Sequence, residues 1–207
     1  MRISKVYTRT GDAGKTRLAG GQEIWKDAVR VETYGTVDEL NSVIGLVRVF
    51  HSESVQDRLQ HPISPHRIDL EQELRWIQNK LFDVGSLLAT APGVTLRNTP
   101  CVTHEHVERL ERMIDTCQAD LAPLKEFILP GGGKISGFLH QARAVCRRAE
   151  RLCVTLMREE EVAPEILKFL NRLSDALFVL ARWVAKMHGE PEFLWERDLA
   201  PRSSSGE

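Results

Sequence analysis

The chain has 207 residues, of which 42% are hydrophobic, so it can bury a sizeable core and does not have the composition of a disordered protein. It carries 28 lysines and arginines against 29 aspartates and glutamates, and the net charge of −1 excludes the basic excess of a general nucleic-acid-binding surface. No apolar run approaches the roughly 18 residues of a membrane span. From the charge we expect no nucleic-acid partner, and from the lack of a long apolar run we expect no membrane partner.

The amino terminus and the cysteines indicate the compartment. Residues 1–5 lead into polar sequence without the apolar stretch of a secretory signal peptide. The cysteines form no C-x-x-C pair, which excludes a zinc ribbon and a thioredoxin-type motif; they are Cys101, Cys117, Cys146 and Cys153. We therefore predict a cytoplasmic protein with buried, reduced thiols.

Residues 1–34 are rich in glycine, threonine and charge and have little helical periodicity, so we interpret them as an extended arm. Within the arm, Gly14-Lys15-Thr16 matches the end of a P-loop. The first glycine of that motif would fall at position 9, which is an arginine, and no helix is expected to follow. The P-loop is therefore rejected. Residues 8–16 remain either an anion-binding loop or an ordinary surface turn.

From Gly35 onward the apolar residues recur every three or four positions, which predicts helices. Thr36 is the expected N-cap of the first, with Glu39 completing a capping box. The polar segment 51–67, with two prolines, is expected to be a loop. The predicted helices cover about 37–50, 68–90, 103–121, 134–160 and 164–188.

Five amphipathic helices with short connections predict an all-α fold, a five-helix bundle with an extended N-terminal arm. Residues 1–190 are expected to form the helical domain, of which 1–34 are the arm. Residues 191–207 form a C-terminal tail.

The fourth predicted helix carries a stripe of arginines on an otherwise apolar surface. Arg143, Arg147 and Arg151 are spaced i, i+4, i+8, which is unfavourable for like charges unless something neutralises them. Guanidinium groups bind phosphate oxygens in a bidentate manner, so the stripe suits a polyphosphate. The alternative is a solvated helix face.

Two further segments break the local pattern. A glycine-rich turn, residues 131–133, precedes the fourth helix, and it is either a flexible connection or an anion site at a helix N-terminus. Asn171 lies in the middle of the fifth helix, where asparagine is unfavourable, so it is expected to bond a neighbour or a ligand.

Five motifs occur in one order along the chain: YTRTGD at 7–12, YGTVDELN at 34–41, LPGG at 129–132, RRAER at 147–151 and NRLSD at 171–175. This set closely resembles the PduO-type ATP:cob(I)alamin adenosyltransferases, also called corrinoid adenosyltransferases. The resemblance covers about residues 1–188. It implies a five-helix bundle that assembles as a homotrimer, with the active site between subunits.

The resemblance also implies roles for individual residues. Asp38 and Arg143 match an intersubunit ion pair, and Phe127 matches an aromatic residue that displaces the lower axial ligand of the corrin. Arg147 and Arg151 match phosphate-binding arginines and complete the implied catalytic set. Phe193, in the aromatic tail, is a second candidate for contact with cobalamin. The implied ATP-binding residues are Thr8, Arg9, Thr10, Gly11, Lys15, Thr16, Arg17, Lys26, Arg147, Arg148, Glu150, Arg151 and Asn171.

The implied reaction is transfer of the 5′-deoxyadenosyl group of ATP to the cobalt of cob(I)alamin, giving adenosylcobalamin and triphosphate. Mg²⁺ would accompany ATP, and the sequence identifies no metal ligands. Cob(II)alamin, a reductase and an adenosylcobalamin-dependent client enzyme are further expected partners. Two alternatives remain: a nucleotide-binding regulator without catalysis, and a helical assembly module that uses the arginines only for subunit contacts.

Overall fold

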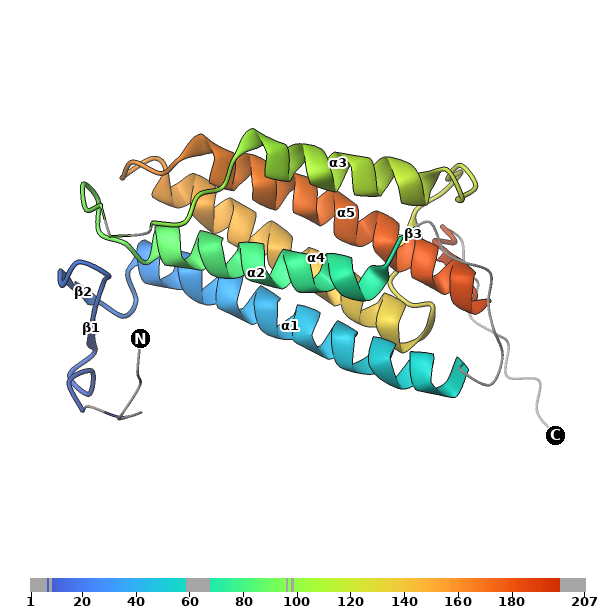
Figure 1. The fold of residues 1–207 in the computed structure, drawn as a ribbon, viewed down its shortest axis with the longest axis horizontal. Coiled ribbons are helices and arrows are strands. Elements are labelled where there is room, and N and C mark those ends of the chain that lie inside the picture. Colours follow the sequence, from blue (N-terminus) through green and yellow to red (C-terminus); the bar gives the residue numbers. More distant parts are fainter. Residues whose placement is uncertain (1–6, 8, 59–67, 96, 98, 198–207) are drawn as a thin grey trace.

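The computed structural model describes residues 7, 9–58, 68–95, 97 and 99–197, with only the backbone of 55–58 (Figure 1). Five helices dominate these residues and confirm the all-α prediction: α1 (Val29–Arg58), α2 (Leu70–Leu88), α3 (His104–Gln118), α4 (Gly133–Leu156) and α5 (Pro164–His188). The four strands are two or three residues long: β1 (Lys15–Arg17), β2 (Glu23–Trp25), β3 (Ile128–Leu129) and β4 (Phe193–Leu194). None of the described helices is apolar over a length that could cross a membrane.

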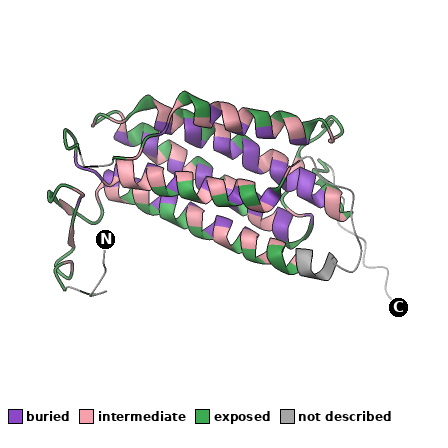
Figure 2. Cartoon of the chain, in the orientation of Figure 1, coloured by how far each residue is buried: buried purple, intermediate pink, exposed green. Residues whose placement is uncertain are grey.

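The helices pack side by side in the order α2, α1, α4, α5, α3. Each turns its apolar face inward (Figure 2), and the core includes Phe169, Leu173 and Leu177 of α5, all inaccessible to solvent. Residues 15–25 lie at the end of the bundle where α1 begins and α4 ends, whereas β3 lies at the opposite end (Figure 1). This arrangement leaves α4 central, in contact with both α1 and α5.

Helix α1 begins at Val29, several residues before the predicted start. The predicted N-cap at Thr36 and its capping box with Glu39 are wrong, because Thr36 lies inside the helix and its Oγ1 donates to a carbonyl one turn earlier at 2.8 Å. The inward face of the first turns carries Arg30 and Thr33, both buried. Because polar residues occupy these core positions, the sequence of the first turns lacks a clear apolar period. This is why the prediction assigned these turns to the arm.

Two other boundaries differ from prediction. Residues 51–58 continue α1 instead of forming a loop, because polar residues such as glutamate and glutamine are good helix formers and the first proline comes only at position 62. Residues 59–67 of the predicted loop lie outside the described residues. Helix α4 ends at Leu156 rather than near 160, where the Glu160 side chain turns back to pair with Arg30 of α1.

The predicted extended arm contains a β-hairpin. Strands β1 and β2 pair antiparallel, with Lys15 opposite Trp25. Leu18 is buried, and Ala19 forms a parallel bridge with Thr90 just beyond α2. The described part of the arm is therefore folded on itself and docked on the end of the bundle.

The cysteines are all free, with Cys101 exposed and the other three buried. Burial raises the pKa of Cys117 to about 12 and that of Cys153 to about 11. These two thiols stay protonated at neutral pH. The prediction of buried thiols is confirmed for Cys117, Cys146 and Cys153 and is wrong for Cys101.

The glycine-rich turn before α4 is filled by a carboxylate of the chain itself. Gly132 is the N-cap in the left-handed region, and Gly133 follows with φ +86°. A Cβ at Gly133 would overlap the carboxylate of Glu190, which therefore lies against the start of α4. Because a carboxylate is favourable at a helix N-terminus, the internal Glu190 takes the place that an external anion could have had.

Replacing Gly133 with alanine is expected to lower the free energy of unfolding by at least about 1 kcal/mol, because a left-handed φ strains a side-chain-bearing residue and the new Cβ displaces Glu190. Gly137→Ala in the same helix is the control: no atom lies near its Cβ position, so it is expected to be neutral or stabilising. Urea unfolding of both variants tests this. Equal stability of the two would contradict the packing described for Glu190.

Candidate functional site

A pocket of ≈ 590 Å³ lies between α4, α5 and the connection that precedes α4. Phe127 forms part of its wall and is 74% exposed, which is unusual for a phenylalanine. The pocket thus joins an apolar wall to the arginine stripe of α4. The polar and aromatic side chains that line it include Phe127, His140, Arg143, Arg147, Asp175 and Phe178.

The C-terminal segment lies beside Phe127. Strand β4 pairs with β3, so that Phe193 is opposite Leu129, and the Trp195 amide donates to the Phe127 carbonyl at 2.7 Å. The rings of Phe127 and Trp195 meet edge to face, with centroids 6.2 Å apart. Phe193 is 55% exposed on this small sheet. The predicted aromatic tail is therefore adjacent to the pocket, and Trp195 is the tail residue whose ring contacts Phe127.

The α4 side of the pocket combines a cation with a buried imidazole, both against Phe178 of α5. The Arg143 guanidinium lies 5.5 Å from the Phe178 ring centroid, and the His140 ring lies 6.1 Å from it. His140 is only 5% exposed. Burial, reinforced by the charge of Arg143, lowers the pKa of His140, so the imidazole is neutral at neutral pH. A neutral imidazole can both donate and accept a hydrogen bond.

Arg147 and Arg151 are exposed, and neither forms an ion pair with any residue that the structure describes. With Arg143 they span about 12 Å along the helix axis at 1.5 Å per residue. Most other arginines of α1, α3 and α5 for which contacts are described have carboxylate partners. The stripe therefore has positive charge to offer an anion.

The remaining members of the 147–151 motif are engaged within the protein. Arg148 pairs with Glu39 of α1, so it projects from a different face of α4 than the stripe. Glu150 Oε1 accepts a hydrogen bond at 3.0 Å from Asn171 Nδ2, which links α4 to α5. Asn171 thus has the neighbour that its position in mid-helix required, and it lies next to the stripe.

The arm gathers a second polar cluster. A Cβ at Gly11 would lie 3.1 Å from Lys26 Nζ, so the ammonium group sits over the 10–11 turn. The Lys26 amide donates to the Gly14 carbonyl at 2.9 Å, which holds the two ends of the hairpin together. Arg9 adopts a left-handed φ of 61°, a strained conformation for arginine. The turn therefore presents an ammonium group and strained backbone at one place.

The other predicted ATP-binding residues of the arm differ in their surroundings. Lys15 pairs with Glu23 at 2.9 Å and lies 5.1 Å from the Trp25 ring centroid, so its charge is already partnered. Thr16 is half-buried and Arg17 exposed, both in β1. The predicted Thr8 contact lies outside the described residues.

Asp38 and Arg143 do not pair with each other within one chain. Asp38 is exposed on α1, Arg143 is half-buried on α4, and neither forms an ion pair with another described residue. Both charges are available to a second molecule. The described residues contain no group of three or more His, Cys, Asp or Glu side chains that could hold a metal ion.

Sequence reasoning missed Phe178 and the contact of Trp195 with Phe127. A signal for Phe178 was present: Asn171, Ser174, Asp175 and Phe178 are spaced i, i+3, i+4, i+7 and so share one face of α5. The pairing of β3 with β4 had no such signal, because strands of two residues leave no periodicity.

The chain matches the family model described as Cobalamin adenosyltransferase over residues 6–184. It is 46% identical over 193 residues to the corrinoid adenosyltransferase of Bacillus subtilis (strain 168), covering 93% of each chain. It is 43% identical over 209 residues to the corrinoid adenosyltransferase MMAB of Homo sapiens, covering 99% of this chain and 78% of that protein.

Solved structures agree with these relatives. A variant of the PduO-type ATP:corrinoid adenosyltransferase from Lactobacillus reuteri, complexed with cobalamin and ATP, superposes with a TM-score of 0.80 at 38% identity, covering 93% of this chain and 97% of that one. A second variant of that enzyme, complexed with ATP, gives a TM-score of 0.79. The fold, the motifs and the relatives agree, and the chain belongs to the cobalamin adenosyltransferase family.

Proposed function

We propose that this protein transfers the 5′-deoxyadenosyl group of ATP to the cobalt of cob(I)alamin and releases triphosphate. The observation that carries the proposal is the continuity of two surfaces: Arg147 lines the pocket that holds Phe127, and the unpaired stripe continues from it to Arg151. An apolar wall suits the corrin macrocycle, and an unpaired arginine stripe suits the triphosphate. Family membership and the relatives complexed with cobalamin and ATP support the same assignment.

The reaction requires no base and no nucleophile from the protein. The electron pair of Co(I) attacks C5′ of ATP, the Co–C bond forms, and the C5′–O bond breaks with its electron pair leaving on triphosphate. No proton is transferred in this step. The protein's contribution is to align the cobalt, C5′ and the leaving oxygen, and to stabilise the charge that grows on triphosphate.

The arginines of the stripe stabilise the negative charge that grows on triphosphate. Arg147 and Arg151 reach the phosphate chain as charge-assisted donors, and the docked arm adds Lys26, Thr10 and the Gly11 backbone. Asn171, fixed by Glu150, contacts the nucleotide next to them. The other predicted ATP contacts stay predictions: Thr8, Arg9, Lys15, Thr16, Arg17 and Arg148. To bind ATP, Lys15 and Arg148 would have to leave or share their present carboxylate partners.

The aromatic wall of the pocket excludes the lower axial ligand and water. Phe127 projects from the connection before α4 and is steadied by Trp195, so it can occupy the space beneath the corrin. Occupying that space displaces the lower axial ligand and keeps water away, which makes cob(II)alamin easier to reduce to cob(I)alamin. Phe193, on the adjacent strand, extends the same apolar surface.

Mg²⁺ is part of the proposed substrate, as the MgATP complex, held by phosphate oxygens and water. The reductase, the client enzyme and the cytoplasmic location inferred from the sequence stay predictions.

We further propose that the active site is completed between subunits of a homotrimer. Within one chain the arm lies at one end of the bundle and β3, next to Phe127, at the other (Figure 1), so one chain presents the two halves of the site apart. Asp38 and Arg143, neither of which forms an ion pair with another described residue, can pair across the interface.

Asp38→Asn is expected to lower the transferase activity about tenfold, because it leaves the partly buried Arg143 guanidinium without its countercharge. Activity and sedimentation of the variant should be measured together at several protein concentrations. Glu53→Gln, an exposed acidic residue further along α1, is the matched control. Full activity of Asp38→Asn with an unchanged oligomer would contradict the intersubunit pair.

Product analysis tests the transferase directly. Anaerobic mixing of the protein, MgATP and chemically reduced cob(I)alamin should release one triphosphate for each cobalamin consumed. Release of ADP or orthophosphate would point to a different reaction at the stripe. ATP binding without any release would favour a nucleotide-binding regulator.

A further inference from the structure

Arg30 is a buried cation at the junction between the arm and the bundle. Its side chain is 3% exposed, and every guanidinium nitrogen has a partner. Nη1 donates to the carbonyls of Leu88 at 2.7 Å and Thr90 at 3.2 Å, where α2 ends. Nε and Nη2 contact Glu160 Oε2 at 2.8 and 2.6 Å, just beyond α4. One side chain therefore ties the start of α1 to the ends of α2 and α4.

Of the two carbonyls that Arg30 binds, that of Thr90 belongs to the segment on which the arm docks and that of Leu88 directly precedes it. The Ala19 amide donates to the Ala89 carbonyl at 2.8 Å, and the Ala91 amide donates back to the Ala19 carbonyl at 3.1 Å. Thr90, bound by Arg30, is the residue paired with Ala19 in this parallel bridge. The docking strip 89–91 is thus fixed from one side by Arg30 and receives the arm on the other.

The surroundings of this junction show what the pair contributes. A small pocket of ≈ 280 Å³ between arm and bundle is lined by Leu18, Ile24, Arg30 and Glu160. Burying an ion pair costs desolvation free energy, and such pairs often add little net stability compared with apolar residues of the same volume. What the pair does give is a fixed geometry, because a planar guanidinium satisfies two carbonyls and a carboxylate only in one arrangement.

We propose that Arg30 and Glu160 are positioning residues for ATP: they hold strip 89–91 so that the docked arm presents the Gly11 turn and Lys26 to the phosphates. The inference rests on the proposed function of the arm in ATP binding. Neither residue touches the reacting atoms. Without the pair, ATP must order the arm as it binds, and that cost appears as weaker ATP binding rather than as slower chemistry.

The test compares Glu160→Gln and Arg30→Met with Arg48→Met. Arg48 is the matched control because it also links two helices, donating to Glu71 and, at 2.7 Å, to Gln78, but about five turns further along α1 from the arm. We expect the KM for ATP to rise about tenfold in Arg30→Met and less in Glu160→Gln, with kcat at saturating ATP and the KM for cobalamin within about twofold of the parent. Arg48→Met should leave all three unchanged.

Amide hydrogen exchange of the ligand-free protein gives a readout that does not depend on transferase activity. The amides of Ala19 and Ala91 should exchange faster in Glu160→Gln than in the parent, with core amides of α5 unchanged. If the parent proves inactive, the proposed function fails while this exchange result still decides the docking claim. If Arg30→Met does not fold, Glu160→Gln carries the test.

Several outcomes would overturn the proposal. They are unchanged exchange at Ala19 and Ala91, a rise in the KM for ATP no larger than that of Arg48→Met, and a fall in kcat with the KM for ATP unaltered. A parallel loss of cobalamin and ATP affinity would also count against it, because that pattern indicates general loosening of the bundle.

Discussion

Arg147→Ala is expected to weaken ATP binding in the transition state by about 1.5–3 kcal/mol, the usual contribution of a hydrogen bond to a charged group. That corresponds to a fall in kcat/KM for ATP of about 10- to 150-fold. The loss follows from the proposed site because the Arg147 guanidinium has no ion-pair partner among the described residues and is therefore available to a phosphate group. Folding should be unaffected, since the side chain is exposed.

Arg158→Ala is the control for this prediction. Arg158 is also exposed and lies just beyond α4, outside the stripe. Steady-state kinetics with ATP varied, at fixed excess of cob(I)alamin, should separate the two variants. Similar kcat/KM values for both would mean that the stripe is a solvated helix face, the alternative that its sequence left open.

Phe127→Ala is expected to lose at least about tenfold in the rate with cob(II)alamin and a reductant, and much less with chemically reduced cob(I)alamin. The difference arises because the ring is needed to displace the lower ligand before reduction, whereas cob(I)alamin needs no such displacement. The ring is 74% exposed, so its removal leaves the core intact.

Phe82→Ala provides the matched control, since Phe82 is 72% exposed on α2 and lies outside the pocket. Both variants should be assayed with both forms of cobalamin. An equal loss in the two assays for Phe127→Ala would remove its assigned role in reduction and leave it only a binding residue.

The helices of the bundle could be predicted because their apolar residues keep a regular period. The start of α1 could not, since its inward positions are occupied by two polar residues: Arg30, whose partners come from distant segments, and Thr33, whose Oγ1 donates to the Val29 carbonyl one turn earlier. The same limit applies to Gly133, where the left-handed backbone was foreseeable but the Glu190 carboxylate against it was not. Local periodicity is visible in a sequence, whereas pairings between distant residues are not.

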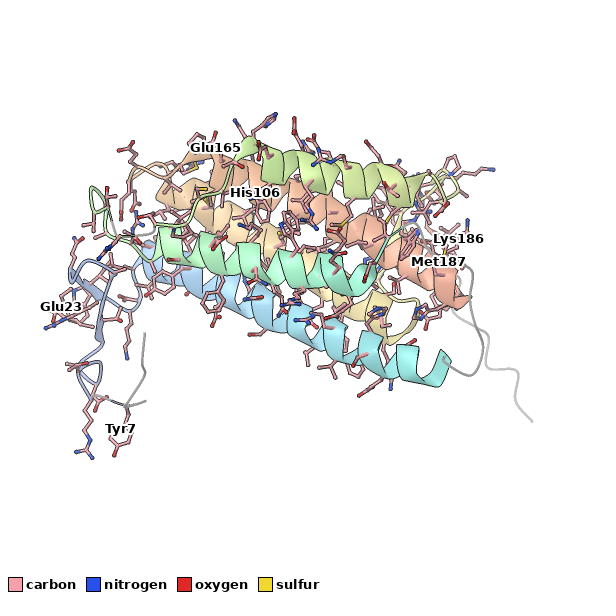
Figure 3. The ribbon with its side chains drawn as sticks, viewed as in Figure 1. Tyr7, Glu23, His106, Glu165, Lys186 and Met187 are labelled. Carbon is pink, nitrogen blue, oxygen red and sulfur yellow. The ribbon has the colours of Figure 1, made fainter. Side chains whose placement is uncertain are left out.

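Part of the candidate site could likewise be predicted from the sequence, and part could not. The arginine stripe follows from helical spacing, and the structure places Arg143 and Arg147 at one pocket with Phe127. Spacing alone could not say that Arg148 pairs with Glu39 while Arg147 has no ion-pair partner among the described residues, because that depends on how α4 is rotated against α1. In the side-chain view, Glu23 lies among the arm residues at one end of the bundle, and Lys186 and Met187 lie toward the other end (Figure 3).

Anaerobic absorbance spectroscopy of cob(I)alamin with MgATP and this protein tests the central claim most directly. We expect conversion to the spectrum of adenosylcobalamin, which light then destroys, with Arg147→Ala slowing the conversion and Arg158→Ala leaving it unchanged. Persistence of the cob(I)alamin spectrum while ATP is bound would contradict adenosyl transfer and assign the stripe to nucleotide binding alone.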